Sequence, residues 1–139
     1  MNVIGIIPAR MGSSRYPGKP LEKIHGMPMI GHCYYRTAMA LGADKVYVAT
    51  CDTEIYDYII SIGGNAVMTN DAHIRATTRT AEALEKIEIE IGKRIDVVVM
   101  VQGDEPAIQP SKIRETVPYF QDNSIDIVNI ISRISTKKA

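Results

Sequence analysis

The chain has 139 residues, and its 16 Lys and Arg balance 16 Asp and Glu, so its formal net charge at pH 7 is zero. A chain of this length predicts one domain, and folding buries roughly two thirds of its unfolded surface. Neutrality gives no overall field that favours nucleic acid or an acidic membrane, so an anion site must be built locally.

The two cysteines, Cys33 and Cys51, have no Cys-x-x-Cys spacing, which argues against a structural zinc site and against a disulfide framework. Reduced thiols in the cytoplasm are the simplest interpretation. The N-terminal apolar run ends at Pro8 and is too short for a signal peptide or a membrane span.

Apolar runs alternate with helical patterns along the chain. Val3 to Ile7 is a continuous apolar run, which is typical of a fully buried strand. Further strands are predicted at 45–49, 66–68, 95–101 and 125–134, and helices at 28–41, 53–62, 76–91 and 111–120. This alternation predicts a three-layer, Rossmann-like α/β fold with a mostly parallel sheet and helices on both faces.

The helix expected at 76–91 is amphipathic. We predict a buried face made of Ala81, Leu84, Ile87 and Ile91. Its acids, Glu82, Glu85 and Glu90, are most simply a solvated face.

A loop rich in Gly, Ser and Pro follows the first strand and carries the cations Arg10, Arg15 and Lys19. In an open α/β sheet the ligand crevice lies beyond the carboxyl ends of the strands, so this loop should lie over it. Gly12 lets backbone amides turn toward an anion, and Arg and Lys hold phosphate oxygens. Each cation about 4 Å from a phosphate charge gains roughly 4 kcal/mol before desolvation. The alternative is a solvated turn with ordinary surface charges.

The loop is not a Walker A motif, G-x-x-x-x-G-K-[ST]. The spacing from Gly12 to Gly18 is one residue too long, and Pro20 stands where that motif needs Ser or Thr. Pro20 also disfavours helix at Lys19. A G-x-G-x-x-G dinucleotide fingerprint is absent after every predicted strand.

A second motif follows the strand predicted at 95–101. Asp104 comes directly after it, where a carboxylate can reach a metal ion over the sheet edge. Mg²⁺ prefers oxygen ligands and commonly takes one or two carboxylates together with substrate phosphates. As a bare sequence, Asp-Glu before Pro also fits an ordinary turn.

Three segments resemble the sugar-activating cytidylyltransferases, above all the CMP-Kdo synthetase (3-deoxy-manno-octulosonate cytidylyltransferase) family. Residues 8–21 follow that family's P-A-R-x-x-S-x-R-x-P-G-K-P-L signature, residues 101–106 match V-Q-G-D-E-P, and residues 73–79 resemble H-x-S-G-T-[DE]-R or its Arg-Ala-Thr variant. Thr78 departs from the pattern, which has an acid there, and this leaves the placement of Arg79 open.

The resemblance implies a nucleotidyltransferase fold and a set of site residues. It implies catalytic roles for Arg10, Lys19 and Asp104, with Asp104 binding Mg²⁺. The implied nucleotide-binding residues are Ala9, Arg10, Gly12, Ser13, Arg15, Lys19, Arg75, Thr77 and Gln102. For His73, His25 and His32, a structural hydrogen-bonding role is the simpler interpretation.

The implied reaction is attack of the anomeric hydroxyl of an acidic sugar, Kdo or a related one, on the α-phosphorus of CTP, with release of pyrophosphate. The resemblance covers about the first half of the family pattern, so residues 1–139 are expected to be the nucleotide-binding, N-terminal part of a longer domain. A second metal ligand, most of the sugar pocket and much of a homodimer interface are expected in the other half. The alternatives are a nucleotide-binding fragment without turnover and a related enzyme for another acid or amino sugar.

Overall fold

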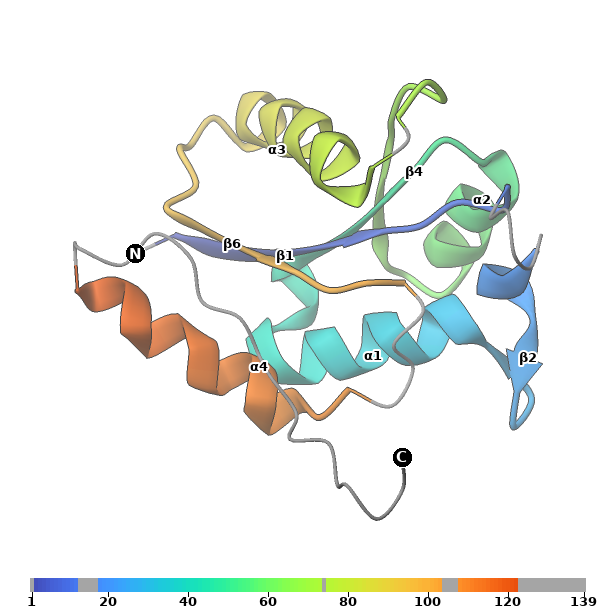
Figure 1. Cartoon of the computed structure of the whole chain (residues 1–139), viewed down its shortest axis with the longest axis horizontal. Helices are drawn as coiled ribbons and strands as arrows, with labels where there is room; N and C mark the ends of the chain where they lie inside the picture. The colour runs from blue at the N-terminus through green and yellow to red at the C-terminus, as the bar shows by residue number, and fades with distance from the viewer. Residues whose placement is uncertain (1, 13–17, 74, 104–107, 123–139) are drawn as a thin grey trace, which may run out of the picture.

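The structure is a computed structural model that describes residues 2–12, 18–73, 75–103 and 108–122 (Figure 1). Its centre is a four-stranded sheet in the order β5-β4-β1-β6. The strands are β1 (Val3–Pro8), β4 (Val46–Thr50), β5 (Asn65–Met68) and β6 (Val97–Met100). All three pairings are parallel, so the carboxyl ends of the strands lie at one edge. The strand expected at 125–134 lies outside the described residues.

Helices cover both faces of the sheet, as the alternation predicts. The helices are α1 (Met29–Leu41), α2 (Thr53–Ser61), α3 (Ala76–Ile91) and α4 (Pro110–Thr116). In Figure 1, α3 lies on one side of the sheet and α1 and α4 on the other. Residues of α1, α2 and α4 share one apolar core with the sheet, and α3 shares a second. The three-layer prediction is therefore confirmed.

β1 is a central strand, and its residues divide between the two cores. Ile7 contributes to the core under α1 and α2, and Ile4 and Ile6 contribute to the core under α3. Gly5 faces α1, where an added Cβ would lie 2.9 Å from Leu41 Cδ1. This close approach explains a glycine inside a buried strand.

A small hairpin precedes α1. Its strands are β2 (Lys23–Ile24) and β3 (Met27–Pro28), joined by His25 and Gly26, which both have positive φ. Two positive-φ residues match the twist of a two-residue hairpin turn. His32 lies 2.7 Å through Nε2 from the Ile24 carbonyl oxygen.

The helix expected at 111–120 divides in two. α4 ends at Thr116, and a 3-10 turn, η3, covers Val117–Gln121. Pro118 has no N–H to donate to the Arg114 carbonyl, whereas the Val117 N–H does reach it. Two shorter 3-10 turns, η1 (Lys19–Leu21) and η2 (Ala43–Lys45), complete the described elements.

The predicted buried face of α3 is confirmed for Ile87, which is fully buried, but it is wrong for Ala81 and Ile91. Ala81 is exposed, Ile91 is 38% exposed and Leu84 only partly buried. The residues that α3 buries are Arg79, Thr80, Ala83 and Ile87. Two of these are polar, so a search for an apolar stripe rotates the expected face away from the true one.

None of the helices in the described residues has the length and apolar character that a membrane span needs.

Candidate functional site

Loops from all four strands meet at the carboxyl edge of the sheet. We call this edge the rim and define it as residues 9–12, 51–52, 69–73 and 101–103. Pairing between strands continues into these loops: Ala9 N donates to Ala49 O at 3.0 Å, and Thr69 N donates to Thr50 O at 2.9 Å. The rim is therefore anchored by the sheet itself.

A backbone hydrogen bond joins the two ends of the cationic loop. Gly18 N donates to Met11 O at 2.8 Å, and Gly18 has φ 82°. η1 then begins at Lys19, so the loop runs into a 3-10 turn of three residues, whereas α1 starts only at Met29. Arg10 and Lys19 are both partly exposed. They consequently stand on either side of one closed loop with their side chains accessible.

Two sequence-predicted residues of this loop, Ser13 and Arg15, lie outside the described residues. Gly12 is exposed, and an added Cβ would meet no described atom within 4 Å. Because its φ is not positive either, the geometry does not by itself demand glycine at this position.

The segment after β6 packs against the start of the cationic loop. A Cβ added to Gly103 would lie 3.0 Å from Pro8 O and 3.1 Å from Ala9 Cβ. The thiol of Cys33 on α1 donates to Gly103 O at 3.4 Å. Gln102, next to it, is partly buried. Asp104, the predicted metal ligand, lies outside the described residues, but the residue before it is placed against Ala9.

A buried guanidinium holds the loop after β5. Arg79 is 3% exposed, and its Nη1 donates to Thr69 Oγ1 at 2.6 Å. Its remaining contacts are longer, at 3.2 Å from Nη2 to His73 O and 3.4 Å from Nη1 to Asn70 O. Arg79 therefore lies inside the protein as a structural residue, although Thr78 stands where the family pattern has an acid.

Glu82 holds the same loop from one turn further along α3. Its carboxylate accepts from Asn70 N at 3.0 Å and from Lys86 Nζ at 2.9 Å, and lies 2.7 Å from His73 Nε2. These bonds, the one from the Asn70 backbone first, lower the pKa of Glu82 to about 2. The expectation of a solvated acidic face is wrong for Glu82. His73 has the structural hydrogen-bonding role that was expected.

The other predicted residues of this segment lie at the start of α3. Arg75 occupies the N-cap position and is exposed, and Thr77 is exposed in the first turn. Thr78 donates through Oγ1 to Arg75 O at 2.9 Å. Thr78 therefore takes part in the helix start, and the side chains of Arg75 and Thr77 remain accessible.

One acid at the rim was not identified from the sequence as a site residue. Asp52 Oδ2 accepts from Met11 N at 2.7 Å, across 41 residues of sequence. The available signal was its position directly after a buried strand, the same position that drew attention to Asp104.

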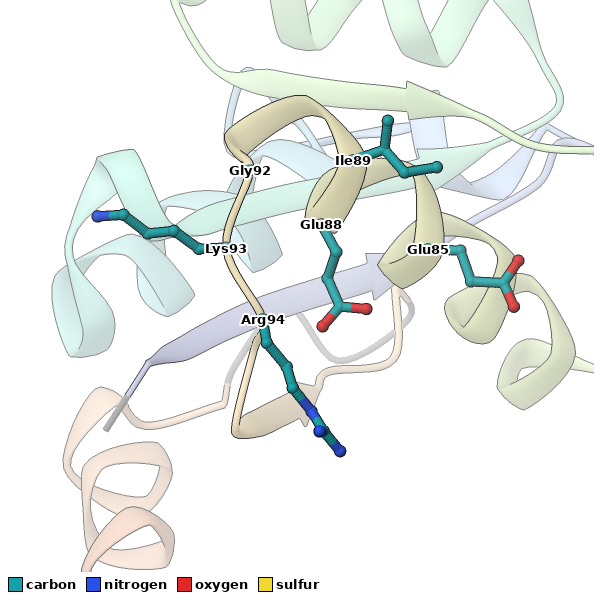
Figure 2. Close-up of a pocket in the computed structure, with 6 residues that line it drawn as sticks. All are labelled: Glu85, Glu88, Ile89, Gly92, Lys93 and Arg94. Carbon is teal, nitrogen blue, oxygen red and sulfur yellow. The ribbon is translucent and has the colours of Figure 1, made fainter.

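A separate surface pocket lies at the other end of α3 (Figure 2). Its lining residues are Glu85, Glu88, Ile89, Gly92, Lys93 and Arg94. Glu88 accepts from Ile95 N at 2.8 Å, just before β6 begins, so this pocket belongs to the amino edge of the sheet. It is not part of the rim.

The fold and the rim define an α/β protein that carries a cationic loop at the carboxyl edge of its sheet. The chain belongs to the cytidylyltransferase family, whose model matches residues 4–138. The family resemblance drawn from the three sequence segments is thereby confirmed.

The chain is similar to two kinds of curated relative. It is 44% identical over 136 residues to the 3-deoxy-manno-octulosonate cytidylyltransferase of Bradyrhizobium diazoefficiens, covering 98% of this chain and 54% of the relative. It is 45% identical over 121 residues to the 8-amino-3,8-dideoxy-manno-octulosonate cytidylyltransferase of Shewanella sp. strain W3-18-1, covering 87% of this chain and 48% of the relative. The chain thus spans about half the length of the curated relatives it matches.

The chain is also similar to a solved structure, of which it again covers about half. CMP:2-keto-3-deoxy-manno-octonic acid synthetase complexed with CTP superimposes with a TM-score of 0.80 at 38% identity, covering 89% of this chain and 49% of that one.

Proposed function

We propose that this chain binds CTP at the rim, as the nucleotide-binding part of a transferase that moves CMP from CTP to an acidic sugar. The acceptor would be Kdo or its 8-amino relative, through the anomeric hydroxyl, with pyrophosphate released. The observation that carries the proposal is the packing of Gly103 against Ala9, which brings two family motifs to one edge of the sheet. The names of the relatives and the CTP in the similar solved structure supply the substrates.

The proposed phosphate site is the closed cationic loop. Arg10 and Lys19 would neutralise phosphate charge, and the bond from Gly18 N to Met11 O holds the two ends of the loop together. Such preorganised donors contribute most to a transfer that depends on positioning and charge neutralisation. The further nucleotide contacts we propose are Ala9, Gly12, Ser13, Arg15, Arg75, Thr77 and Gln102.

We also propose that Asp104 holds Mg²⁺. Among the described residues, no group of three or more His, Cys, Asp or Glu side chains is arranged to hold a metal ion. The carboxylate of Asp52 already accepts the Met11 N–H. Mg²⁺ commonly takes only one or two carboxylates, with waters and phosphates as its other ligands, so a single acid following Gly103 fits this ion. When bound, it would offset negative charge on the triphosphate.

The assembly and compartment are part of the same proposal. Neither Cys33 nor Cys51 takes part in a disulfide in the part of the chain that the structure describes, as fits a reducing cytoplasm. We expect residues 1–139 to act as the nucleotide-binding, N-terminal part of a longer domain. We expect a protein with the full length of the relatives to be a homodimer.

A nucleotide-binding chain without turnover is the second candidate. It is favoured by one observation: this chain covers 54% and 48% of the lengths of the two relatives. Pyrophosphate release with CTP, Mg²⁺ and Kdo separates the candidates, because CTP binding without release supports only the second.

Lys19→Ala tests the site itself. We expect the substitution to weaken CTP binding at least tenfold, and to lower turnover at least tenfold where release is measurable, since losing one charge-assisted contact of about 1.4 kcal/mol has that effect. Isothermal titration calorimetry with CTP measures the affinity. Lys23→Ala is the matched control, because Lys23 is an exposed cation of the neighbouring hairpin. Equal affinity in the Lys19 variant and the wild type would reject the assignment.

A further inference from the structure

Asp52 stands at the N-cap of α2, yet its side chain makes no capping hydrogen bond. The helix start is supported by the backbone, because Tyr56 N donates to Asp52 O at 3.1 Å. The carboxylate instead turns across the rim, where Oδ2 accepts from Met11 N at 2.7 Å. A residue type that commonly caps helices is thus used for a contact between two loops.

The position of Asp52 is fixed by the sheet. Its backbone N–H donates to Thr50 Oγ1 at 3.1 Å, and Thr50 is fully buried at the end of β4. Thr50 O in turn accepts from Thr69 N at 2.9 Å. The thiol of Cys51 lies 3.7 Å from Asp52 Oδ2, as a weak additional donor. The buried Thr50 therefore holds the backbone of Asp52 in place.

Met11 is the residue on which the cationic loop closes. Its carbonyl accepts from Gly18 N at 2.8 Å, while its N–H donates to Asp52. Both backbone groups of Met11 are consequently engaged, and it lies directly between Arg10 and Gly12. Loss of the Asp52 contact would free the closing point of the loop from the neighbouring strand.

Asp52 also carries a negative charge at the rim. A carboxylate at an edge that binds a triphosphate repels the ligand, so a favourable contact such as that with Met11 is needed to outweigh the repulsion. A backbone N–H bound to an ionised carboxylate at 2.7 Å is a strong, charge-assisted hydrogen bond. A neutral Ser or Thr would cap α2 equally well but is too short to replace the carboxylate in this contact.

We infer that Asp52 is a positioning residue for the phosphate-binding loop: it holds Met11, and through Met11 it sets Arg10 and Lys19 for the nucleotide. The inference rests on the proposed function, since it assigns Asp52 a part in CTP binding. Asp52 does not touch the nucleotide in this role.

Three substitutions separate positioning from helix capping. Asp52→Ser removes the bond to Met11 and offers α2 a side chain that can cap it. Asp52→Ala removes the bond and offers no cap, and Asp52→Asn keeps an acceptor oxygen without the charge. We expect Asp52→Ser and Asp52→Ala to weaken CTP binding about tenfold, the effect of losing one hydrogen bond of about 1.4 kcal/mol to a charged group. Asp52→Asn should bind CTP within about twofold of the wild type, or more tightly, because repulsion is also removed.

A readout without ligand follows the loop directly. Amide hydrogen exchange measured by NMR should become faster at Met11 and Gly18 in Asp52→Ser, and remain near the wild-type rate in Asp52→Asn. Glu54→Gln is the matched control, because Glu54 is an exposed acid in the first turn of the same helix. It should change neither the CTP affinity nor these exchange rates.

The outcomes are distinct. A wild-type chain that does not bind CTP refutes the proposed function. If the wild type binds CTP and Asp52→Ser binds it equally well, the inference alone is refuted. Asp52→Asn that binds CTP as weakly as Asp52→Ser, while exchange at Met11 stays near the wild-type rate, also overturns it, since the carboxylate would then act through its charge and not by holding the loop. Unchanged exchange at Met11 in Asp52→Ser would show that the loop is held by other contacts.

Discussion

Replacing Arg79 by Met should destabilise the protein strongly, although Arg79 is a charged residue on a surface helix. The guanidinium is 3% exposed and donates to Thr69 Oγ1, His73 O and Asn70 O. Met keeps most of the apolar volume of the side chain and removes all three donors. The loop after β5 then loses its attachment to α3 from this residue.

The expected cost follows from those contacts. A hydrogen bond from a charged donor contributes about 1.5–3 kcal/mol, and unpaired buried acceptors add a desolvation cost. The bond to Asn70 O, at 3.4 Å, is long and contributes least. Because burying the guanidinium itself costs free energy, we expect a net loss of about 3 kcal/mol. For a chain of this size that corresponds to a decrease in Tm of about 10 °C.

Urea unfolding followed by circular dichroism measures the loss, with the m-value checked for a two-state transition. Arg75→Met is the matched control, because Arg75 is an exposed arginine four residues earlier and should change the free energy of unfolding by less than about 0.5 kcal/mol. A loss below about 1 kcal/mol in Arg79→Met would refute the anchoring role. Water would then satisfy the acceptors that lose the guanidinium.

Two further predictions concern Glu82 and Gly103. The lowered pKa of Glu82, about 2, means that its stabilising contribution is present above about pH 4.5 and is lost as the pH falls toward 2. Between pH 6 and pH 3 the wild type should therefore lose about 1 kcal/mol more stability than Glu82→Gln, an amount reduced by solvent screening. The control Glu85→Gln should follow the wild-type curve of stability against pH. Parallel curves for the wild type and Glu82→Gln would contradict the assignment. Gly103→Ala should cost about 1–3 kcal/mol of unfolding free energy, because its Cβ would press on backbone at Pro8 O, 3.0 Å away. Gly12→Ala is the control with no such neighbour, and equal stability of the two alanine variants in urea would show that the rim can widen without cost.

The layers and most element positions could be predicted because they depend on local patterns. The four strands of the parallel sheet were expected within a few residues of their observed bounds, since continuous apolar runs mark strands buried on both faces. On α3 the same method finds the buried Ile87 but not the buried polar residues of that face. Arg79 and Thr80 are buried through hydrogen bonds, and a hydrophobic pattern contains no information on such pairing.

The candidate site divides in the same way. Local motifs correctly bring the cationic loop and the segment before Asp104 to one edge of the sheet, because each directly follows a buried strand. The contact of Asp52 with Met11 spans 41 residues, and that of Glu82 with Asn70 joins a helix to a loop. Pairings of this kind depend on the packed geometry, so the sequence alone shows each acid without its partner.

The strand order has a consequence for how the rim forms during folding. The chain builds outward from β1 to β4 and β5, then returns past β1 to add β6 on the other side, a topological switch point. Asn2 and Asp96, which flank the β1–β6 pairing, are 94 residues apart, so this step carries the largest loop-closure entropy in the sheet. Gly103 cannot reach Ala9 before that pairing is made. The proposed nucleotide site would therefore form late in folding, after this long-range pairing is complete.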